Sequence, residues 1–215
     1  NGRRRQRQMC IRDRSTPIGL FTEILNQIDK KFEIKSNFFW VDERCVDPSS
    51  VDSNFGSANK HFFSKVNISN NNIFRIRGEE KPEIEASNYT ELLKTKTETI
   101  KNIPSLDLCL LGIGGDGHTA SIFPHELKKL SDKSDCVVGI NPDSGQKRVS
   151  LSIKQINNSK EVIFHVCGSG KKDVVDMIIS KRENYLDLPA SHILPNSKNL
   201  SWYLDFDSAE TFMGT

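Results

Sequence analysis

The segment 106–124 constrains the fold of this chain more than any other part of the sequence. Residues 106–113 form a short apolar run of the kind that is buried on both faces of a parallel sheet. Glycines at positions 112, 114, 115 and 117 then turn the chain sharply. Asp116 and His118 therefore lie at the carboxyl end of a strand, where open α/β sheets bind their ligands.

The remaining pattern predicts the fold class. From Ser15 onward, helix-like and strand-like segments alternate, which is typical of βαβ units. We expect a single α/β domain, Rossmann-like, with a doubly wound, mostly parallel sheet and helices on both faces. The expected helices are 16–29, 52–65, 84–102 and 172–181, with a short helix or turn at 124–130. The expected strands are 37–41, 73–76, 106–113, 136–141, 149–153, 162–167 and 192–194; 42–44 is expected to be a charged loop, and 200–204 closes the domain.

Charge is concentrated at the start of the chain. The first fourteen residues contain six arginines and one acid, and without them 24 basic and 27 acidic residues remain. This basic arm has no aromatic residue for base stacking, so nucleic-acid binding is not favoured. Residues 3–14 show neither helical nor strand periodicity. We interpret 1–14 as a non-native or artefactual segment and 15–215 as the domain.

Cysteine usage and hydropathy predict the compartment. The five cysteines are scattered without a C-x-x-C pair, which fits buried thiols in a reducing environment. No apolar run approaches the roughly 18 residues that span a bilayer, and no signal-peptide pattern opens the chain. We therefore expect a soluble, cytoplasmic protein with no membrane partner.

The glycine loop has two interpretations besides catalysis. It matches G-x-G-x-x-G, which is typical of dinucleotide sites. However, the next strand, 136–141, ends without the carboxylate that a dinucleotide ribose needs, and His118 would crowd a pyrophosphate. The other interpretation is a tight strand-to-helix connection with a surface Asp116 and a helix-capping His118, without any chemistry.

Two further strand ends carry polar groups. At 40–44, Arg44 presents a planar fork suited to phosphate or carboxylate, and Asp42 can orient hydroxyls. At 162–172, a strand runs through a glycine turn into a helix, where Lys171 and the helix amides suit a phosphate. This is not a Walker A loop, because His165 takes the place of its first glycine.

Each of these motifs alone is also explained by a solvated loop or a chance lysine. Together, the three strand ends converge on one edge of a parallel sheet and predict a phosphate-plus-hydroxyl pocket with one acid/base histidine. The chain has no G-x-S-x-G elbow and no H-E-x-x-H or Cys/His cluster. A serine nucleophile, a metal and a cofactor are therefore not expected.

These residues resemble the 6-phosphogluconolactonases, within a wider group that includes the glucosamine-6-phosphate deaminases. The resemblance covers about 15–205 and rests on motifs in the family's order at 15–17, 40–44, 52–54, 112–124, 170–171 and 188–190. It implies a metal-free enzyme that hydrolyses 6-phospho-D-glucono-1,5-lactone to 6-phosphogluconate, the second step of the oxidative pentose phosphate pathway.

The resemblance also assigns roles. His118 looks like the general base toward the attacking water, with Asp116 to orient or assist it. The glycine-loop amides are candidates for stabilising the oxyanion. The residues expected to bind substrate are Thr16, Asp42, Arg44, Asn54, Gly114, Gly115 and Lys171, of which Arg44, Lys171 and Thr16 resemble the phosphate ligands.

Two other functions stay open. The deaminases carry a glutamate five positions after the histidine, and this chain has Phe123 there, which cannot transfer the protons of isomerisation. A sugar-phosphate binding protein without catalysis is the second alternative. A link to glucose-6-phosphate dehydrogenase, by fusion or side by side, is a further expectation.

The start of the domain departs from the family's pattern. Asp13 and Arg14 stand where the family carries two glycines before Ser-Thr-Pro. Without them the backbone approaches a phosphate less closely, and Asp13 adds repulsive charge. The residues before them resemble nothing in the family, so its first strand and helix are predicted to be missing, which would expose the edge of a neighbouring strand.

Overall fold

The structure is a computed structural model that describes residues 8–11, 16–29, 31–131 and 133–213. The side chains of residues 8–11, 16, 17, 129–131 and 213 are outside this description. Among the described residues, no helix is both long and apolar enough to cross a lipid bilayer.

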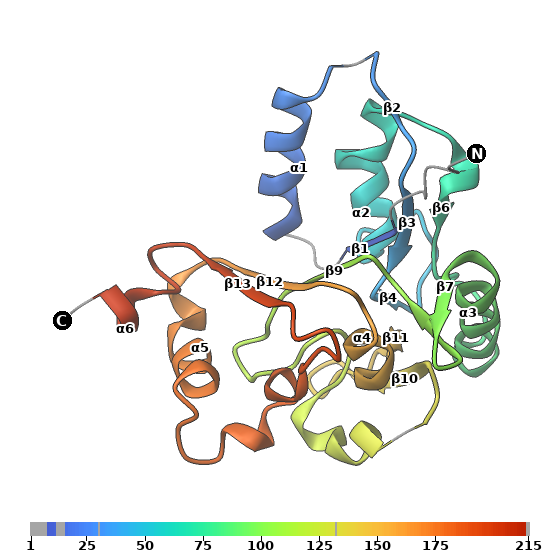
Figure 1. Cartoon of the computed structure of the whole chain (residues 1–215). Coiled ribbons are helices and arrows are strands. Elements are labelled where there is room, and N and C mark those ends of the chain that lie inside the picture. Colours follow the sequence, from blue (N-terminus) through green and yellow to red (C-terminus); the bar gives the residue numbers. More distant parts are fainter. Residues whose placement is uncertain (1–7, 12–15, 30, 132, 214–215) are drawn as a thin grey trace.

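A six-stranded sheet forms the centre of the fold, in the order β13-β12-β9-β1-β3-β6 (Figure 1). All its neighbouring strands are parallel. The chain runs outward from β1 through β3 to β6, then returns to the other side of β1 with β9, β12 and β13. The strands are β1 (Gln8–Ile11), β3 (Asn37–Trp40), β6 (Ile73–Phe74), β9 (Leu108–Leu111), β12 (Val162–Val166) and β13 (Leu200–Leu204).

A second, three-stranded sheet is antiparallel and has the order β10-β11-β4. It consists of β10 (Cys136–Ile140), β11 (Lys147–Leu151) and β4 (Asp42–Arg44). Two small pairs complete the strands: β2 (Glu33–Ile34) with β5 (Asn67–Ile68), and β7 (Glu98–Ile100) with β8 (Ile103–Ser105). The small sheet matters for the site because β4 directly follows the central strand β3.

Helices cover the large sheet. In Figure 1, α1 and α2 stand side by side on one side of the strands, and α5 lies on the other. The α-helices are α1 (Thr16–Gln27), α2 (Asn54–His61), α3 (Pro82–Lys96), α4 (Ile153–Asn157), α5 (Lys172–Ile179) and α6 (Glu210–Met213). The 3-10 helices are η1 (Phe63–Lys65), η2 (Asn70–Asn72), η3 (Pro124–Ser131), η4 (Ser169–Lys171), η5 (Tyr185–Asp187) and η6 (Pro189–His192).

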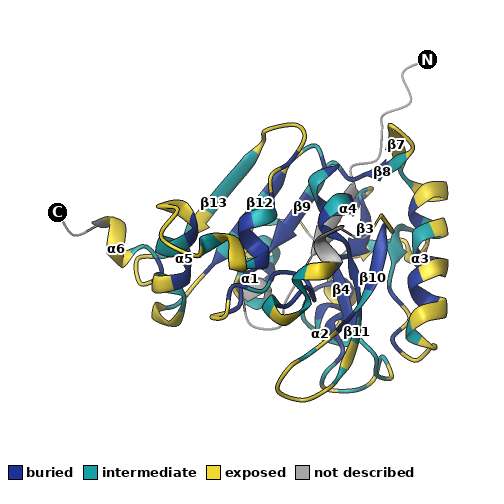
Figure 2. Ribbon diagram, turned by 90° about the horizontal axis from the view of Figure 1, so that it is seen from below, coloured by how far each residue is buried: buried dark blue, intermediate teal, exposed yellow. Residues whose placement is uncertain are grey.

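The core lies between the sheet and its helices. Figure 2 shows buried residues along β9, β12 and β3, while the outer turns of α3 are exposed. Aromatic pairs fill much of the space; the rings of Phe164 and Trp202 stack at 4.1 Å, and those of Phe39 and Phe74 at 4.9 Å. Full burial of such a side chain contributes roughly 1.5–3 kcal/mol, and Phe39 and Phe164 are fully buried, so this packing holds the strand ends in fixed positions.

The prediction that the start of the chain lacks a strand is wrong for Gln8–Ile11. This segment is β1, which pairs with β3 on one side and β9 on the other, with Cys10 opposite Cys109. The expected exposed edge beside a missing strand is therefore filled. The apolar run Met9-Cys-Ile is short and flanked by polar residues and arginines, so the sequence shows no strand periodicity there. Residues 1–7 and 12–15, including Asp13 and Arg14, lie outside the described residues, so a non-native origin for 1–14 stays a prediction.

Three other expected elements differ. The predicted loop 42–44 is strand β4, because the carboxylates of Asp42 and Glu43 find donors inside the protein. The helix predicted to reach residue 102 ends at Lys96, and β7 and β8 follow as a hairpin. Its turn residues Lys101 and Asn102 have φ of 54° and 63°, as a type I′ hairpin turn requires. The strand predicted at 192–194 is absent, since η6 ends at His192.

Candidate functional site

A cavity of about 180 Å³ lies where the predicted strand ends meet. We call it the histidine cavity. Its lining residues are Asp42, Arg44, Asn54, Ile113, Gly114, His118, Asn141, Arg148 and Lys171. His118 follows β9, Lys171 follows β12, and Arg44 lies on β4 after β3, so three separate segments of the sequence supply it. The predicted convergence of polar strand ends therefore holds for these residues.

The glycine loop after β9 has the geometry that its sequence predicts. The amide of Gly114 donates to the carbonyl oxygen of His118 at 2.8 Å, and the amide of Gly117 donates to that of Gly114 at 3.0 Å. Gly117 has a φ of 79°, in the region that favours glycine. A Cβ atom at Gly114 would lie only 2.0 Å from Nδ1 of His118. Glycine at position 114 is thus required for the histidine to fold back over its own loop.

Asp116 and His118 form a direct side-chain pair. Nδ1 of His118 lies 2.5 Å from Oδ1 of Asp116, and the same oxygen accepts from the His118 amide at 3.2 Å. The imidazole is 21% exposed and the carboxylate 43% exposed. Partial burial raises the pKa of Asp116, but the hydrogen bond and charge of His118 outweigh it and lower that pKa to about 2. The carboxylate is therefore ionised at neutral pH.

This pairing fixes the chemistry that the imidazole can perform. An ionised carboxylate only accepts hydrogen bonds, so Nδ1 carries the proton in the pair. Nε2 of a neutral His118 is then left with a lone pair and can accept a proton. The ring of Phe123 packs against the imidazole with 4.8 Å between ring centres. The histidine is thus oriented from two sides.

Asp42 anchors the histidine segment to the small sheet. It is 1% exposed, and its Oδ2 accepts from the Ser121 hydroxyl at 2.6 Å. The side-chain Nδ2 of Asn54 donates to the backbone carbonyl oxygen of Asp42 at 2.9 Å. These bonds connect β4, the start of α2 and the chain three residues after His118. Asp42 lines the cavity as predicted, with one of its oxygens engaged by Ser121.

Arg44 is held at one end of its guanidinium. Its Nη1 donates to the carbonyl oxygen of Asp52 at 2.9 Å. Among the described residues, its buried Nε has no hydrogen-bond partner, and neither does the buried Oδ1 of Asn54. Buried polar atoms without partners are uncommon and cost about 1–3 kcal/mol each, so two of them on one cavity indicate a site that a polar ligand completes.

Glu43, which sequence reasoning left without a role, fixes the entrance to α2. Its carboxylate accepts from the amides of Asn54 and Phe55, both at 2.7 Å, and from the amide of Arg44 at 2.9 Å. Burial raises the pKa of Glu43, and these amides oppose the rise. The side chain thus caps the helix start and positions Arg44 and Asn54 together.

Lys171 approaches the glycine loop from β12. Gly168 precedes it with a φ of 97°, and the Gly168 amide donates to Asp205 at 2.8 Å, which fixes the turn. A Cβ atom at Gly115 would lie 3.6 Å from the Gly170 carbonyl, so the two turns are adjacent. Gly115 and Asp116 border the histidine cavity without lining it. Thr16 begins α1, but its side chain lies outside the described residues.

Asn141 and Arg148 line the cavity and were missed by sequence reasoning. Arg148 lies opposite Arg44 in the β11–β4 pairing, and Asn141 directly follows β10. Both come from the antiparallel sheet, which the sequence pattern does not reveal. The only available signal was an arginine at the start of a strand-like segment, 148–151.

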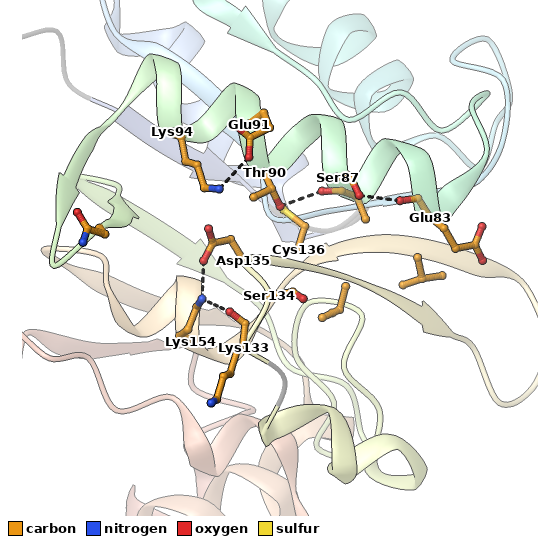
Figure 3. A pocket seen from close by; sticks show the side chains of 14 residues that line it. Glu83, Ser87, Thr90, Glu91, Lys94, Lys133, Ser134, Asp135, Cys136 and Lys154 are labelled. Carbon is orange, nitrogen blue, oxygen red and sulfur yellow. Dashed lines mark hydrogen bonds and ion pairs between the residues drawn. The ribbon is translucent and has the colours of Figure 1, made fainter.

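A larger cavity, of about 660 Å³, lies between α3 and β10, and we call it the α3 groove (Figure 3). Two of its lysines are paired with carboxylates. Lys94 points to Glu91 at 2.8 Å, and Lys154 points to Asp135 at 2.7 Å. It contains no histidine, and burial raises the pKa of its cysteine, Cys136, to about 12. This groove therefore offers neither an imidazole nor a reactive thiolate.

The histidine cavity, by contrast, gathers cations around a partly covered imidazole. Arg44, Arg148 and Lys171 line it, and the lining carboxylate, Asp42, is hydrogen-bonded to Ser121. Such a site attracts an anionic ligand. In the described part of the chain, no three His, Cys, Asp or Glu side chains gather as a metal site.

Comparisons with known proteins agree with this geometry. A model of the family described as glucosamine-6-phosphate isomerases/6-phosphogluconolactonase matches residues 9–202. The 6-phosphogluconolactonase of Treponema pallidum is 38% identical over 167 residues, which are 77% of this chain and 69% of that protein. The human GDH/6PGL endoplasmic bifunctional protein is 30% identical over 94% of this chain and 26% of its own length. The crystal structure of devB protein has a TM-score of 0.91 and 36% identity, over 97% of this chain and 88% of that one.

Proposed function

The chain belongs to the glucosamine-6-phosphate isomerase/6-phosphogluconolactonase family, and from this premise we propose that the histidine cavity is where water opens a sugar-phosphate lactone. The protein is an enzyme that hydrolyses 6-phospho-D-glucono-1,5-lactone to 6-phosphogluconate. The single observation that carries the site assignment is the Asp116–His118 pair at the cationic cavity.

His118 acts as the general base. Its Nε2 accepts a proton from water as the water oxygen bonds to C1 of the lactone. The ring C1–O bond then breaks, and the imidazolium returns the proton to the departing ring oxygen. Asp116 is the positioning residue, because its ionised carboxylate holds Nδ1–H and stabilises the positive charge on the ring.

Arg44 and Lys171 bind the 6-phosphate, and Thr16 joins them at the start of α1. The buried Nε of Arg44, without a partner among the described residues, is a donor for a phosphate oxygen, and Lys171 supplies a second positive charge. Asn54 and Asp42 contact the sugar hydroxyls. Fixing the phosphate at one end of the cavity places the lactone ring at the other, near His118.

The oxyanion formed at the carbonyl needs donors. Of the two glycines assigned to substrate, Gly114 already donates its amide to the His118 carbonyl. We therefore assign the oxyanion to the Gly115 amide, and Gly114 serves chiefly to leave room for the Asp116–His118 pair.

Phe123 favours the lactonase over the deaminase. It is buried against the imidazole at the position where the deaminases are expected to carry a second acid/base residue. A phenyl ring moves no proton, so ring opening and isomerisation of an amino sugar lack a required group. Lactone hydrolysis needs only an activated water and a stabilised oxyanion.

Three finer assignments belong to the same proposal. The sheet order, read as 3-2-1-4-5-6, supports a doubly wound, Rossmann-like arrangement that reverses between β1 and β9, beside the glycine loop. The human bifunctional relative supports a functional link to glucose-6-phosphate dehydrogenase, which makes the lactone. A cytoplasmic location fits that chemistry.

Hydrolysis of freshly prepared 6-phosphogluconolactone, corrected for the spontaneous rate, tests the proposal. We expect His118→Asn to lower kcat by about 10²–10⁴-fold, the usual contribution of a general base, with little change in KM. His61→Asn, at the end of α2 and away from the cavity, is the matched control and should retain the wild-type rate. Wild-type rates in the His118→Asn variant would refute the role of His118, and a wild-type chain no faster than background would refute the function.

A further inference from the structure

Arg44 and Arg148 reach the histidine cavity from neighbouring strands. They are opposite each other in the antiparallel pairing of β4 with β11, so their side chains leave the small sheet on the same face. Both line the cavity. Their surroundings nevertheless differ, which separates their roles.

Arg148 is associated with the histidine through Phe123. The guanidinium carbon of Arg148 lies 5.6 Å from the centre of the Phe123 ring, and that centre is 4.8 Å from the centre of the His118 imidazole. The guanidinium and the imidazole are thus at most 10.4 Å apart. Arg44 instead donates to the Asp52 carbonyl, in the loop that leads into α2.

This upper limit leaves room for the reacting atoms between the two groups. A water within about 3 Å of Nε2, a C1 atom about 3 Å beyond it and a carbonyl oxygen within about 3 Å of a guanidinium nitrogen together occupy such a span. Phe123 also restricts the guanidinium, since a cation over an aromatic face is held in place by about 0.5–2 kcal/mol. A restricted cation needs no reorganisation when charge develops during the reaction.

We propose that Arg148 is a catalytic residue that donates hydrogen bonds to the lactone carbonyl oxygen as it becomes an oxyanion. As the water oxygen bonds to C1, the carbonyl π electron pair moves onto that oxygen, where Arg148 and the Gly115 amide stabilise it. The pair returns when the ring C1–O bond breaks, and the proton held by His118 goes to the ring oxygen. This role rests on the proposed lactonase function.

Two kinds of measurement separate this role from phosphate binding. The first is kcat and KM for fresh 6-phosphogluconolactone; the second is the inhibition constant of glucose 6-phosphate, which carries the phosphate but no lactone carbonyl. The variants are Arg148→Met, Arg148→Lys and Arg148→Gln, compared with Lys171→Met. Arg182→Met is the control, because Arg182 is an exposed partner of Asp176 on α5. Thermal unfolding verifies that each variant is folded.

We expect Arg148→Met to lower kcat by about 10²–10³-fold, as for the loss of one oxyanion donor, and to change the KM and the inhibition constant by less than about threefold. Arg148→Lys should recover part of the loss, because it keeps the charge. Lys171→Met should show the reverse pattern, with both constants raised and kcat mostly kept. If Arg148→Met does not fold, Arg148→Gln takes its place with the same expected result.

Two results overturn the proposal while leaving the lactonase function intact. One is an Arg148 variant that raises both KM and the inhibition constant as Lys171→Met does and keeps kcat, which would make Arg148 a phosphate ligand. The other is a folded Arg148 variant with all constants at wild-type values. A wild-type chain without activity above background overturns the proposed function, and this role with it.

Discussion

The histidine cavity and the α3 groove show that size and charge content do not locate a reaction. The groove is the larger, at about 660 Å³ against about 180 Å³, and both are lined by several charged side chains. In the groove, however, Lys94 is paired with Glu91 and Lys154 with Asp135. In the histidine cavity, Arg44 and Lys171 form no ion pair with a carboxylate among the described residues, and the buried Nε of Arg44 and Oδ1 of Asn54 have no hydrogen-bond partner there. The buried Oδ1 of Asp135 in the groove also has no hydrogen bond within the described part of the chain, but the Lys154 ammonium lies 2.7 Å from it.

The difference lies in what each region does with its hydrogen-bonding groups. The ion pairs of the groove connect Lys94 to Glu91 within α3 and Lys154 of α4 to Asp135 beside β10, so they serve packing. The bonds of Asp42 and Glu43 hold the other side chains of the histidine cavity in position, while leaving an arginine and an amide oxygen incomplete. Incomplete but well-supported polar groups are therefore the better marker of a ligand site.

Gly114→Ala should have the largest effect on the histidine cavity and none on the α3 groove. Its Cβ would lie 2.0 Å from Nδ1 and 2.3 Å from Cε1 of His118, so the imidazole must move away from Asp116. We expect a loss of about 10²-fold or more in kcat, since a displaced catalytic group costs this much. Gly19→Ala is the matched control, because nothing lies within 4 Å of its Cβ position in α1, and it should keep full activity. Equal kcat in the two variants would mean that the pair is not needed.

Asp116→Asn tests the pair without changing its shape. An asparagine keeps the volume but loses the charge that holds Nδ1–H, so we expect a decrease in kcat of about 10–10²-fold, below the loss seen at fully buried triads. The measurement is kcat at neutral pH with the lactone in excess. The corresponding change in the α3 groove, Glu91→Gln, should leave kcat unaltered. A larger effect from Glu91→Gln than from Asp116→Asn would place the chemistry in the groove.

Lys154→Met tests whether the ion pairs of the α3 groove contribute to stability and not to catalysis. It leaves Asp135, which is 6% exposed, without its ion-pair partner. We expect the free energy of unfolding to fall by about 1–2 kcal/mol, less than for a fully buried pair because Lys154 itself is 31% exposed. Urea unfolding gives this value, and kcat should stay at the wild-type level. A decrease in kcat with unchanged stability would contradict a structural role for the groove.

Ser121→Ala removes the hydroxyl that donates to Asp42. Because both groups are buried, the loss of this hydrogen bond should cost about 1 kcal/mol or somewhat more in unfolding free energy. The histidine segment loses an anchor, so kcat should fall by a small factor as well. Urea unfolding and kcat together test this. Unchanged values of both would show that Ser121 does not anchor the segment.

The smallest effect is the pH dependence of stability that the Asp116–His118 pair contributes. The pKa of Asp116 is lowered from 3.8 to about 2 in the folded protein, so the pair stabilises fully above pH 3.8 and loses this contribution as pH falls toward 2. Because the carboxylate is 43% exposed, solvent screens the pair and the contribution is small. Urea unfolding between pH 5 and about 2 should give a slightly shallower decline for Asp116→Asn than for wild type. If the unfolding free energy of both proteins depends on pH in the same way, the pKa of Asp116 is not lowered in the folded protein.

Sequence reasoning predicted the parts of the site that depend on local pattern. An apolar run followed by glycines places His118 at a strand end, and the parallel topology brings Lys171 and Arg44 to the same edge. The antiparallel sheet could not be predicted in this way. Arg44 and Arg148, which lie opposite each other in the β4–β11 pairing, are more than a hundred residues apart in the sequence, and neither strand's sequence indicates which strand it pairs with. Arg148 and Asn141 were missed for that reason.

The other misses have local causes. Strand β1 was missed because arginines flank its few apolar residues, and only pairing on both sides by β3 and β9 makes this segment central. Glu43 looked like a solvated loop residue because its amide partners, in Asn54 and Phe55, follow eleven and twelve positions later. In both cases tertiary contacts determine the structure, and the local sequence pattern does not predict these contacts.

Binding of the reaction product locates the site without any substitution in the chain. Amide chemical shifts in a ¹H–¹⁵N NMR titration with 6-phosphogluconate should move for Gly115, His118, Arg148 and Lys171 around the histidine cavity. The amide chemical shifts of Thr90, Asp135 and Cys136 in the α3 groove should not change. Saturable shifts confined to the groove, with none at the glycine loop, would contradict the assignment of the reaction to the histidine cavity.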